Sequence, residues 1–372
     1  MLTVYGLKCS YFTGKLEGYL RYKEIPFEYR SIRSQQFERE LPKLVGAMQM
    51  PAAQASDGRW MTDTSPMIDW LETQHPEPSI LPADPTLAFL CRLIEDYADE
   101  WLWRPAMHYR WSYPESAKLL RRQIVDEMAT DVSYPKALIR LMVEKRQHRN
   151  FVRDHGVTPA NRTHVEQGYL RPLAILREVF RARPYLFGSR PTLADIGLFG
   201  PFFRHFAMDP TPGRIMRETA PEVMEWVYRL WNAKASALPD DLLTEFPKDL
   251  SPVLREIGET HLPNLCANAA AYAARAKTFS VQIQGAAYQD VFVSRYRVWC
   301  LEKLQQRFAA LDPDAHRKTA SLLEEHGCLE PLTRLSVESG YDLAGEAPFG
   351  NRSLPVQPEI RSPDPFRRAA KA

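Results

Sequence analysis

The chain has 372 residues, enough for two or three domains, and its 45% hydrophobic and 25% charged residues are typical of a folded globular protein. Its formal net charge of +2, without a basic block interleaved with aromatic residues, argues against nucleic acid as a partner. No apolar run approaches the roughly 18 residues that cross a bilayer, and the N-terminus lacks the pattern of a secretory signal. We therefore expect neither a membrane span nor secretion.

The five cysteines are odd in number and widely scattered: Cys9, Cys91, Cys266, Cys300 and Cys328. This distribution favours reduced thiols over a disulfide framework, and no metal-ligand spacing is visible among them. The sequence predicts a cytoplasmic protein without a bound metal.

The first eighty residues alternate between strand and helix patterns. Residue spacing predicts strands at 2–6, 27–30, 51–55 and 59–61, and helices at 11–23, near 34–46 and at 64–74. The last two strands flank Asp57-Gly58, a strong signal for a tight hairpin. The order β-α-β-α-β-β-α combines a parallel strand pair with an antiparallel edge. It predicts a thioredoxin-like α/β domain over residues 1–82.

A proline-rich boundary at residues 75–85 separates this domain from a largely helical region. Helical spacing recurs at 86–103, 115–130, 134–152, 165–182, 193–206 and 220–233. We therefore expect an all-helical domain over residues 86–249.

The remainder of the chain changes character. Two segments that alternate polar and apolar residues lie on either side of Gly285, which indicates a hairpin, and helical patterns follow at 295–311 and 314–326. We expect an additional α+β module over residues 250–345 and an irregular tail, rich in Pro and Arg, over residues 346–372.

Ser10 stands between the first strand and the first helix. Its hydroxyl can cap the helix, and the same helix end can stabilise an incoming thiolate through free N–H groups and a partial positive charge. A hydrogen bond from Ser10 to that sulfur would favour its charged form. Cys9 is the competing candidate, as a thiol with a lowered pKa or as a small core residue.

Two further positions combine structural and ligand-binding roles. Met50-Pro51 precedes the third strand and is either an ordinary trans proline or a cis bond that turns the Met50 backbone toward a peptide-like ligand. Asp63-Thr64 opens the third helix with a favoured N-cap residue. Its N–H groups and the Thr64 hydroxyl also make a carboxylate site, and Asp63 could meet an ammonium group.

These positions fall together in one known pattern. Residues 10–17 (SYFTGKLE) resemble the cytosolic glutathione transferases, in which Ser, Cys or Tyr follows the first strand and a basic residue, here Lys15, comes five positions later. Met50-Pro51 is similar to the family's Val-Pro pair, whose proline is cis. Residues 63–71 (DTSPMIDWL) are similar to the stretch in which acidic and hydroxyl residues hold the γ-glutamyl end of glutathione. Residues 191–196 (PTLADI) resemble the family's Ser/Thr-x-x-Asp box, in which Thr192 and Asp195 cap a helix.

The resemblance extends to about residue 235 and implies a Ser-type active site. It implies that Ser10 is catalytic and that glutathione, the co-substrate, contacts Ser10, Tyr11, Gln49, Met50, Pro51, Asp63 and Thr64. Gln49 and Lys43 are the candidates for the contact with the glycine carboxylate. The family pattern does not account for the C-terminal extension.

The resemblance also implies a function and an assembly. We expect a glutathione transferase that activates the thiolate for attack on a small hydrophobic electrophile, and a homodimer. The candidate wall for the electrophile is the aromatic-rich set Trp101, Trp103, His108, Tyr109 and Trp111. Two alternatives stay open: a glutathione-binding scaffold or regulatory protein with little turnover, and thiol-disulfide chemistry through Cys9.

Overall fold

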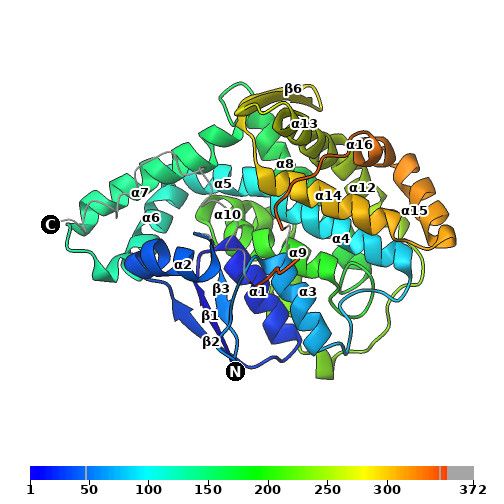
Figure 1. The fold of residues 1–372 in the computed structure, drawn as a ribbon, viewed down its shortest axis with the longest axis horizontal. Helices are drawn as coiled ribbons and strands as arrows, with labels where there is room; N and C mark the ends of the chain where they lie inside the picture. The colour runs from blue at the N-terminus through cyan, green and yellow to red at the C-terminus, as the bar shows by residue number, and fades with distance from the viewer. Residues whose placement is uncertain (47, 343–344, 350–372) are drawn as a thin grey trace.

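The computed structural model describes residues 1–46, 48–342 and 345–349 (Figure 1). The N-terminal domain contains a four-stranded sheet in the order β2-β1-β3-β4, built from β1 Leu2–Gly6, β2 Phe27–Ser31, β3 Ala52–Gln54 and β4 Trp60–Thr62. The β1–β2 pair is parallel, whereas β1–β3 and β3–β4 are antiparallel. Its helices are α1 Tyr11–Tyr22, α2 Leu41–Val45 and α3 Thr64–Gln74. The predicted thioredoxin-like arrangement is confirmed.

Eight α-helices follow in the described residues 85–231. They are α4 Pro85–Glu100, α5 Trp103–Trp111, α6 Pro114–Met128, α7 Lys136–Phe151, α8 Arg162–Ala182, α9 Leu193–Pro201, α10 Pro210–Thr219 and α11 Pro221–Trp231. The predicted helix 86–103 corresponds to α4, which ends before a turn at Trp101 and Leu102, and most of α5 lies beyond the predicted range. Helix α10 lies in a stretch that the sequence patterns did not predict to be helical. A π-helical segment at Phe202–Ala207 continues from α9.

The capping box of α9 is present as the resemblance implies. The Thr192 side chain and the Asp195 side chain cap each other's backbone, and Asp195 Oδ2 accepts from the Thr192 N–H at 3.0 Å. Asp195 Oδ1 also accepts from the Leu186 N–H at 3.0 Å and from the indole N–H of Trp226 at 3.2 Å. These bonds satisfy a buried carboxylate and link three segments of the helical domain.

Helix α1 lies between the sheet and the helical domain, where α9 packs closely against it. A Cβ atom at Gly18 would lie only 2.6 Å from the Phe199 ring. The absence of a side chain at this position therefore allows the two helices to approach each other. This contact fixes the position of α1, whose N-cap residue is Ser10.

The last part of the chain adds helices and a hairpin. It contains α12 Ser251–Glu256, α13 Leu262–Ala273, β5 Thr278–Ile283, β6 Ala286–Phe292, α14 Arg295–Ala309, α15 Pro313–Glu325 and α16 Leu329–Thr333. The expected hairpin and the two helices after it are confirmed, whereas α12 and α13 are additional. We call residues 250–342 the C-terminal module.

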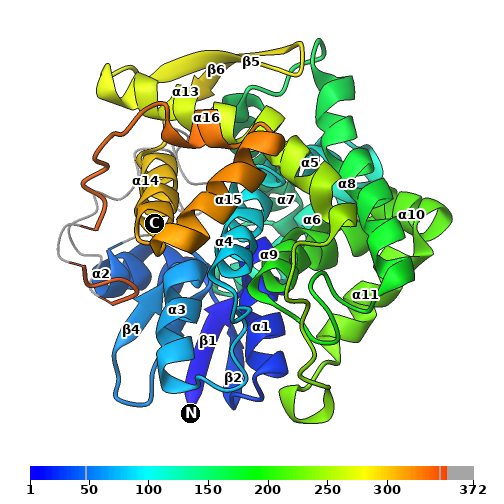
Figure 2. The same cartoon turned by 90° about the vertical axis from the view of Figure 1, so that its right-hand side faces the viewer.

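The C-terminal module packs on the helical domain (Figure 2). Helices α14 and α15 both contact α4, and Arg307 of α14 donates to Asp69 of α3 at 2.9 Å. Buried apolar residues from the sheet, the helical domain and the module form one continuous core. Most of the predicted tail lies outside the described residues.

Candidate active site

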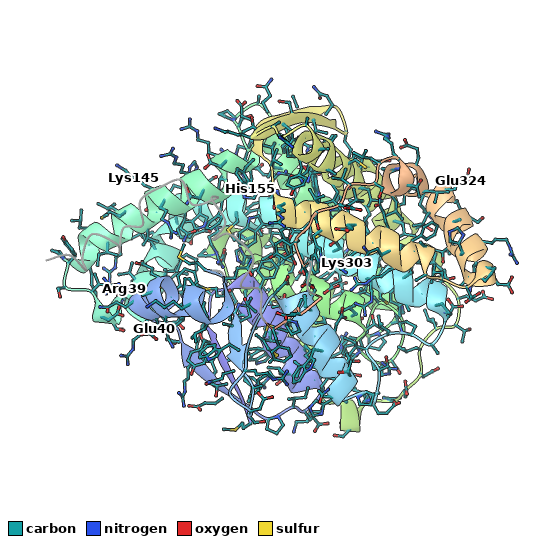
Figure 3. All side chains as sticks on the ribbon, in the orientation of Figure 1. Arg39, Glu40, Lys145, His155, Lys303 and Glu324 are labelled. Carbon is teal, nitrogen blue, oxygen red and sulfur yellow. The ribbon has the colours of Figure 1, made fainter. Side chains whose placement is uncertain are left out.

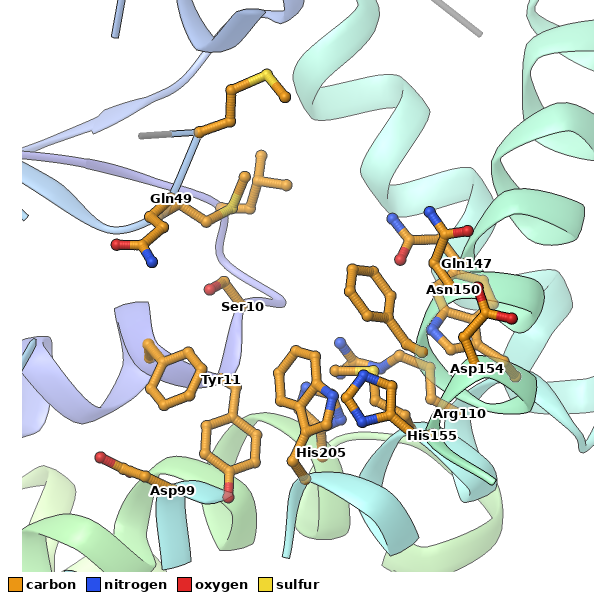
Figure 4. A pocket seen from close by; sticks show the side chains of 18 of the residues that line it. Ser10, Tyr11, Gln49, Asp99, Arg110, Gln147, Asn150, Asp154, His155 and His205 are labelled. Carbon is orange, nitrogen blue, oxygen red and sulfur yellow. The ribbon is translucent and has the colours of Figure 1, made fainter. Parts of the chain in front are cut away.

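A cavity of about 420 Å³ lies where the three parts of the chain meet. This volume is within the range of small-molecule sites. Its walls come from the β1–α1 junction, the loop before β3, the start of α3, helices α4 to α7, and the module. Figure 4 shows Ser10 on one side of this cavity and Gln147 and Asn150 of α7 on the opposite side.

Ser10 caps α1 and lines the cavity. Its Oγ accepts a long hydrogen bond from the Thr13 N–H at 3.4 Å, which confirms the predicted capping role. A hydroxyl that accepts in this way can also donate its proton. The side chain therefore offers a donor at the positive end of α1, beside the cavity.

Cys9 also lines the cavity, but its thiol is buried, with 6% of the residue exposed. Burial raises the pKa of Cys9 to about 11, and the nearby Arg110 only partly offsets this effect. The thiol is therefore neutral near pH 7, whereas nucleophilic cysteines have a lowered pKa. These properties favour the interpretation of Cys9 as a small core residue over that of a reactive thiol with a lowered pKa.

Tyr11 contributes its ring rather than its hydroxyl. The hydroxyl donates to the Ala98 carbonyl of α4, and burial raises the Tyr11 pKa well above its usual value. The ring makes an edge contact with Trp103, with centroids 5.6 Å apart. Tyr11 therefore lines the cavity as an aromatic surface.

Gln49, Met50 and Pro51 form another part of the cavity wall, and the Met50–Pro51 peptide is cis, as the resemblance implies. Lys43, the alternative candidate for the glycine carboxylate, is exposed on α2 and is not among the residues that line the cavity.

Asp63 and Thr64 line the cavity at the start of α3. Asp63 occupies the N-cap position, but its side chain makes no capping hydrogen bond, so the predicted capping role of this side chain is wrong. The backbone has φ of 72°, a left-handed conformation that a non-glycine residue seldom adopts. Asp63 Oδ1 instead accepts from the Tyr296 hydroxyl at 3.0 Å, while Oδ2 is buried without a partner among the described residues. Burial raises the Asp63 pKa to about 7.

Lys15 is fully buried beneath the site and joins α1 to α3 and α4. Its Nζ lies 2.7 Å from Glu95 Oε1 and 2.5 Å from Asp99 Oδ2, and it donates to Ser65 Oγ at 3.1 Å. Burial disfavours the cation, but Asp99 and Glu95 outweigh burial and raise the Lys15 pKa. This basic residue therefore holds the first domain against the second, at a distance from the cavity surface.

The aromatic wall is only partly as predicted. Trp103 and Trp111 line the cavity, whereas Trp101, His108 and Tyr109 do not. Because α5 begins at Trp103, its cavity face carries positions 103, 107, 110 and 111, and the other three aromatic residues point elsewhere.

These three residues have structural partners instead. Trp101 packs on Tyr288 of the module with centroids 6.1 Å apart, and His108 contacts Glu166 at 3.2 Å. Tyr109 stacks on Tyr113 with centroids 5.3 Å apart. These three residues therefore pack against structural partners and are not among the residues that line the cavity.

Arg110 was not predicted from the sequence, although it lines the cavity and links three segments of its wall. Its guanidinium donates to Asp209 at 2.8 and 2.9 Å, to the Cys9 carbonyl at 2.8 Å and to the Arg204 carbonyl at 2.7 Å. The predicted wall contains four positions of α5 and Trp101, which precedes the helix. The spacing of seven residues from Trp103 places Arg110 on the cavity face once the start of the helix is known.

Helix α7 supplies the wall opposite Ser10 with Val143, Arg146, Gln147 and Asn150. Their spacing places them on one helix face. Asn150 is only 6% exposed, and neither atom of its amide has a hydrogen-bond partner among the described residues. A buried amide of this kind is suited to receive a polar group of a ligand.

The C-terminal module closes the remaining side through Thr278, Asp290, Phe292, Ser294, Tyr296 and Arg297. Arg297 Nε donates to Glu100 Oε2 at 3.0 Å, and Nη2 lies 3.3 Å from Nδ1 of His155. His155 lies between the end of α7 and the start of α14 (Figure 3). No sequence signal connected this module with the site.

Among the described residues, no group of His, Cys, Asp and Glu is arranged to hold a metal ion. Nor does any helix in that part of the chain have the length and apolar character needed to cross a membrane.

Comparison with known proteins identifies two family domains. Residues 4–79 match the glutathione S-transferase N-terminal domain, and residues 154–233 match the glutathione S-transferase C-terminal domain. No curated protein matches the chain.

Several solved structures are similar to parts of the chain. The β-etherase LigF from Sphingobium sp. strain SYK-6 is 20% identical, with a TM-score of 0.42, and the match covers 62% of this chain and 94% of that one. A glutathione S-transferase from Rhodospirillum rubrum F11 is 21% identical, with a TM-score of 0.40 and coverage of 61% and 86%. A glutathione S-transferase from Methylobacterium radiotolerans, in complex with glutathione sulfonate, is 19% identical, with a TM-score of 0.40 and coverage of 66% and 98%.

The two family domains occur in the family's order, and the strand order and the α9 capping box agree with them. The chain therefore contains segments that match the N-terminal and the C-terminal domain of the glutathione S-transferase family.

Proposed function

We propose that the protein is a glutathione transferase in which Ser10 stabilises the thiolate of glutathione for attack on a small hydrophobic electrophile. The observation that carries this proposal is the shared cavity: Ser10, Met50-Pro51 and Asp63-Thr64 all line it. A peptide-sized ligand could contact all three at once, with its thiol at the positive end of α1.

In this proposal the γ-glutamyl carboxylate of glutathione binds the N–H groups at the start of α3 near Thr64, and its ammonium group faces Asp63. The Met50 backbone pairs with the peptide, and Gln49 contacts the glycine carboxylate. The thiol loses its proton to solvent, and the Ser10 hydroxyl donates to the resulting thiolate. The sulfur then forms a bond to the electrophilic carbon, whose leaving group takes the electron pair of the bond that breaks.

The second substrate would bind against the helical wall. Trp103, Met107 and Trp111 of α5 offer an apolar surface, and Phe151 makes an edge contact with Trp103 at 5.4 Å. Asn150 adds a polar anchor whose amide has no partner in the described chain. We propose an electrophile with an apolar body and one hydrogen-bonding group.

The test is a comparison of Ser10→Ala with Cys9→Ala. A hydrogen bond to a charged group contributes about 1.5–3 kcal/mol, so Ser10→Ala should lower kcat by about 10- to 100-fold and raise the pKa of the bound thiol. Glutathione affinity at low pH, where the thiol is neutral, should change little. Cys9→Ala should retain activity and form the control. Full conjugating activity in Ser10→Ala would remove Ser10 from the mechanism.

Two alternatives give different outcomes. Glutathione binding without turnover across several electrophile classes would indicate a scaffold or regulatory protein. A glutathione adduct on Cys9 after treatment with oxidised glutathione would indicate thiol-disulfide chemistry, which the burial and raised pKa of this thiol disfavour.

Compartment and assembly are also proposals. All five cysteines are free and buried, which suits the cytoplasm. We propose a homodimer, as in the family, but α14 and α15 already contact α4, and α14 is linked to α3. A dimer would therefore need a surface that this module leaves open, and light scattering on the full chain measures its mass directly.

A further inference from the structure

The C-terminal module reaches the part of the cavity where the γ-glutamyl group is proposed to bind. The contact is made by Tyr296, in the first turn of α14, whose hydroxyl donates to Asp63 Oδ1 at 3.0 Å. The two residues are 233 positions apart in the chain. Residues 4–79 and 154–233 carry the family domains, so Tyr296 lies outside both of them.

The start of α14 is held firmly in place. Ser294 caps the helix by accepting from the Arg297 N–H at 3.4 Å. Asn268 of α13 accepts from the Ser294 N–H and donates to its carbonyl, each at 2.8 Å. A buried amide that satisfies both backbone groups of one residue restricts the position of that residue. Because Tyr296 follows only two positions later on the same helix, the position of its backbone is restricted as well.

The Tyr296 ring is also fixed by its neighbours. It packs against Trp299 and Tyr341, with ring centroids 5.5 and 5.2 Å apart. Burial raises the Tyr296 pKa well above its usual value, and the nearby Asp63 carboxylate adds to this effect. The phenol is therefore protonated throughout the neutral pH range and acts as the donor to Asp63.

Asp63 has one carboxylate oxygen engaged and the other available. Tyr296 occupies Oδ1, while Oδ2 is buried without a partner among the described residues. A buried carboxylate oxygen without a donor is costly unless a ligand supplies one. Since Asp63 lines the cavity, a cationic N–H group of a ligand is the donor that suits it best.

We propose that Tyr296 is a positioning residue that orients Asp63, so that its free oxygen receives the ammonium group of the γ-glutamyl end of glutathione. This inference rests on the proposed function, because it assumes that glutathione occupies the cavity. The glutathione half of the site is then built from two separate parts of the chain, and the module is a component of the site rather than an accessory.

The electrostatic surroundings of Asp63 support this role. Burial raises its pKa to about 7, the hydrogen bond from Tyr296 and the charge of Lys15 lower it, and Glu100 and Glu95 raise it again. The Cys300 thiol, with a raised pKa, also lies near Asp63. Loss of the Tyr296 hydroxyl removes one of the two effects that favour the carboxylate, so ammonium binding should weaken most near neutral pH and recover as the pH rises.

The test compares Tyr296→Phe with Tyr272→Phe in the full chain. Tyr272 belongs to the same module, donates to the Ser339 carbonyl at 3.1 Å and is not among the cavity-lining residues, so it is a matched control. Calorimetric titrations at pH 6.5, 7.5 and 8.5 would use two probes, glutathione and glutaryl-cysteinylglycine, which lacks only the ammonium group.

At pH 7.5 we expect Tyr296→Phe to bind glutathione about tenfold more weakly, and to bind glutaryl-cysteinylglycine as the unmodified protein does. Tyr272→Phe should match the unmodified protein with both probes. Unchanged glutathione affinity in Tyr296→Phe, or an equal loss for both probes, would overturn the positioning role.

A second variant keeps the test decisive if Tyr296→Phe does not fold. Asp63→Asn should weaken glutathione binding at all three pH values and spare the analogue, and equal affinity for glutathione would overturn the inference. Failure of the unmodified protein to bind glutathione at all would instead contradict the proposed function, on which this inference depends.

Discussion

The buried cluster around Lys15 leads to a specific prediction about stability. Lys15→Met removes the cation and keeps a side chain of similar length. The side chains of Lys15 and Glu95 are 0% and 4% exposed, so Glu95 would be left as a buried carboxylate without its counterion. Burial alone would raise the Glu95 pKa, but Lys15 and Arg92 outweigh it and hold the pKa below its usual value. Asp99 has a pKa well above its usual value, mainly because of burial.

The expected loss of stability in Lys15→Met follows from the cost of protonating Glu95, which has lost its counterion. At pH 7 Glu95 would have to bind a proton about three pH units above the usual carboxyl pKa, at about 1.4 kcal/mol per unit, which costs about 4 kcal/mol. This agrees with the 3–5 kcal/mol that is typical when one partner of a buried ion pair is removed. At pH 5 the same protonation costs only about 1 kcal/mol.

In the unmodified protein, Glu95 and Lys15 should contribute no such pH dependence over the same range. The lowered Glu95 pKa contributes stability above the unfolded-state pKa, which is lost only as the pH falls through the folded-state value. The raised Lys15 pKa contributes stability throughout the range below the unfolded-state lysine pKa. Both contributions are therefore intact at pH 5 and at pH 7.

Urea denaturation of both proteins at pH 7 and pH 5 measures these differences. Lys118→Met, at an exposed position of α6, controls for the loss of a surface charge. Adding Glu95→Gln to Lys15→Met should recover much of the lost stability at pH 7, because it removes the buried charge. Equal destabilisation at the two pH values would refute the argument from the buried charge.

Three further predictions concern the cavity. Trp103→Ala should raise the KM for the electrophile, measured by steady-state kinetics, with a smaller change in stability. Trp101→Ala should lower the free energy of unfolding by about 3–5 kcal/mol, measured by urea denaturation. In the native protein, Cys9 should react with iodoacetamide at pH 8 far more slowly than an exposed thiol, because burial raises its pKa to about 11; rapid labelling seen by peptide mass spectrometry would contradict this. Glutathione affinity should fall as the pH drops from 8 to 6, because protonation of Asp63, with a pKa of about 7, removes the partner of the ammonium group; calorimetry that shows no such fall would argue against that pairing.

The sequence predicted the local elements well because short-range patterns determine them. Strands and hairpins of the first domain follow from alternation and from the Asp57-Gly58 turn, and the α9 cap follows from Thr192 and Asp195. Helix α5 was not predicted as a separate helix, because neither Gly nor Pro marks the turn at Trp101 and Leu102. Helix α10 was missed because the prolines at its start are as typical of a loop as of a first helical turn.

The site was predictable where it depends on residues close in the sequence. Ser10, Met50-Pro51 and Asp63-Thr64 belong to short motifs and line one cavity. The opposite wall depends on how α5, α7 and the module pack, which spacing along one helix does not determine. Tyr296 could not be predicted, because its role depends on a contact with a residue far away in the chain.

The contribution of the C-terminal module to the cavity also determines when the cavity is completed during synthesis. Both family domains have been synthesised by residue 233, yet Tyr296 and Arg297 are still missing from the wall. At a synthesis rate of about 5–20 residues per second, the ribosome needs roughly 3–13 s more to reach them, and longer to release them for folding. During this interval the nascent chain contains Ser10 and Asp63 but lacks the residues that close this side of the cavity in the full chain.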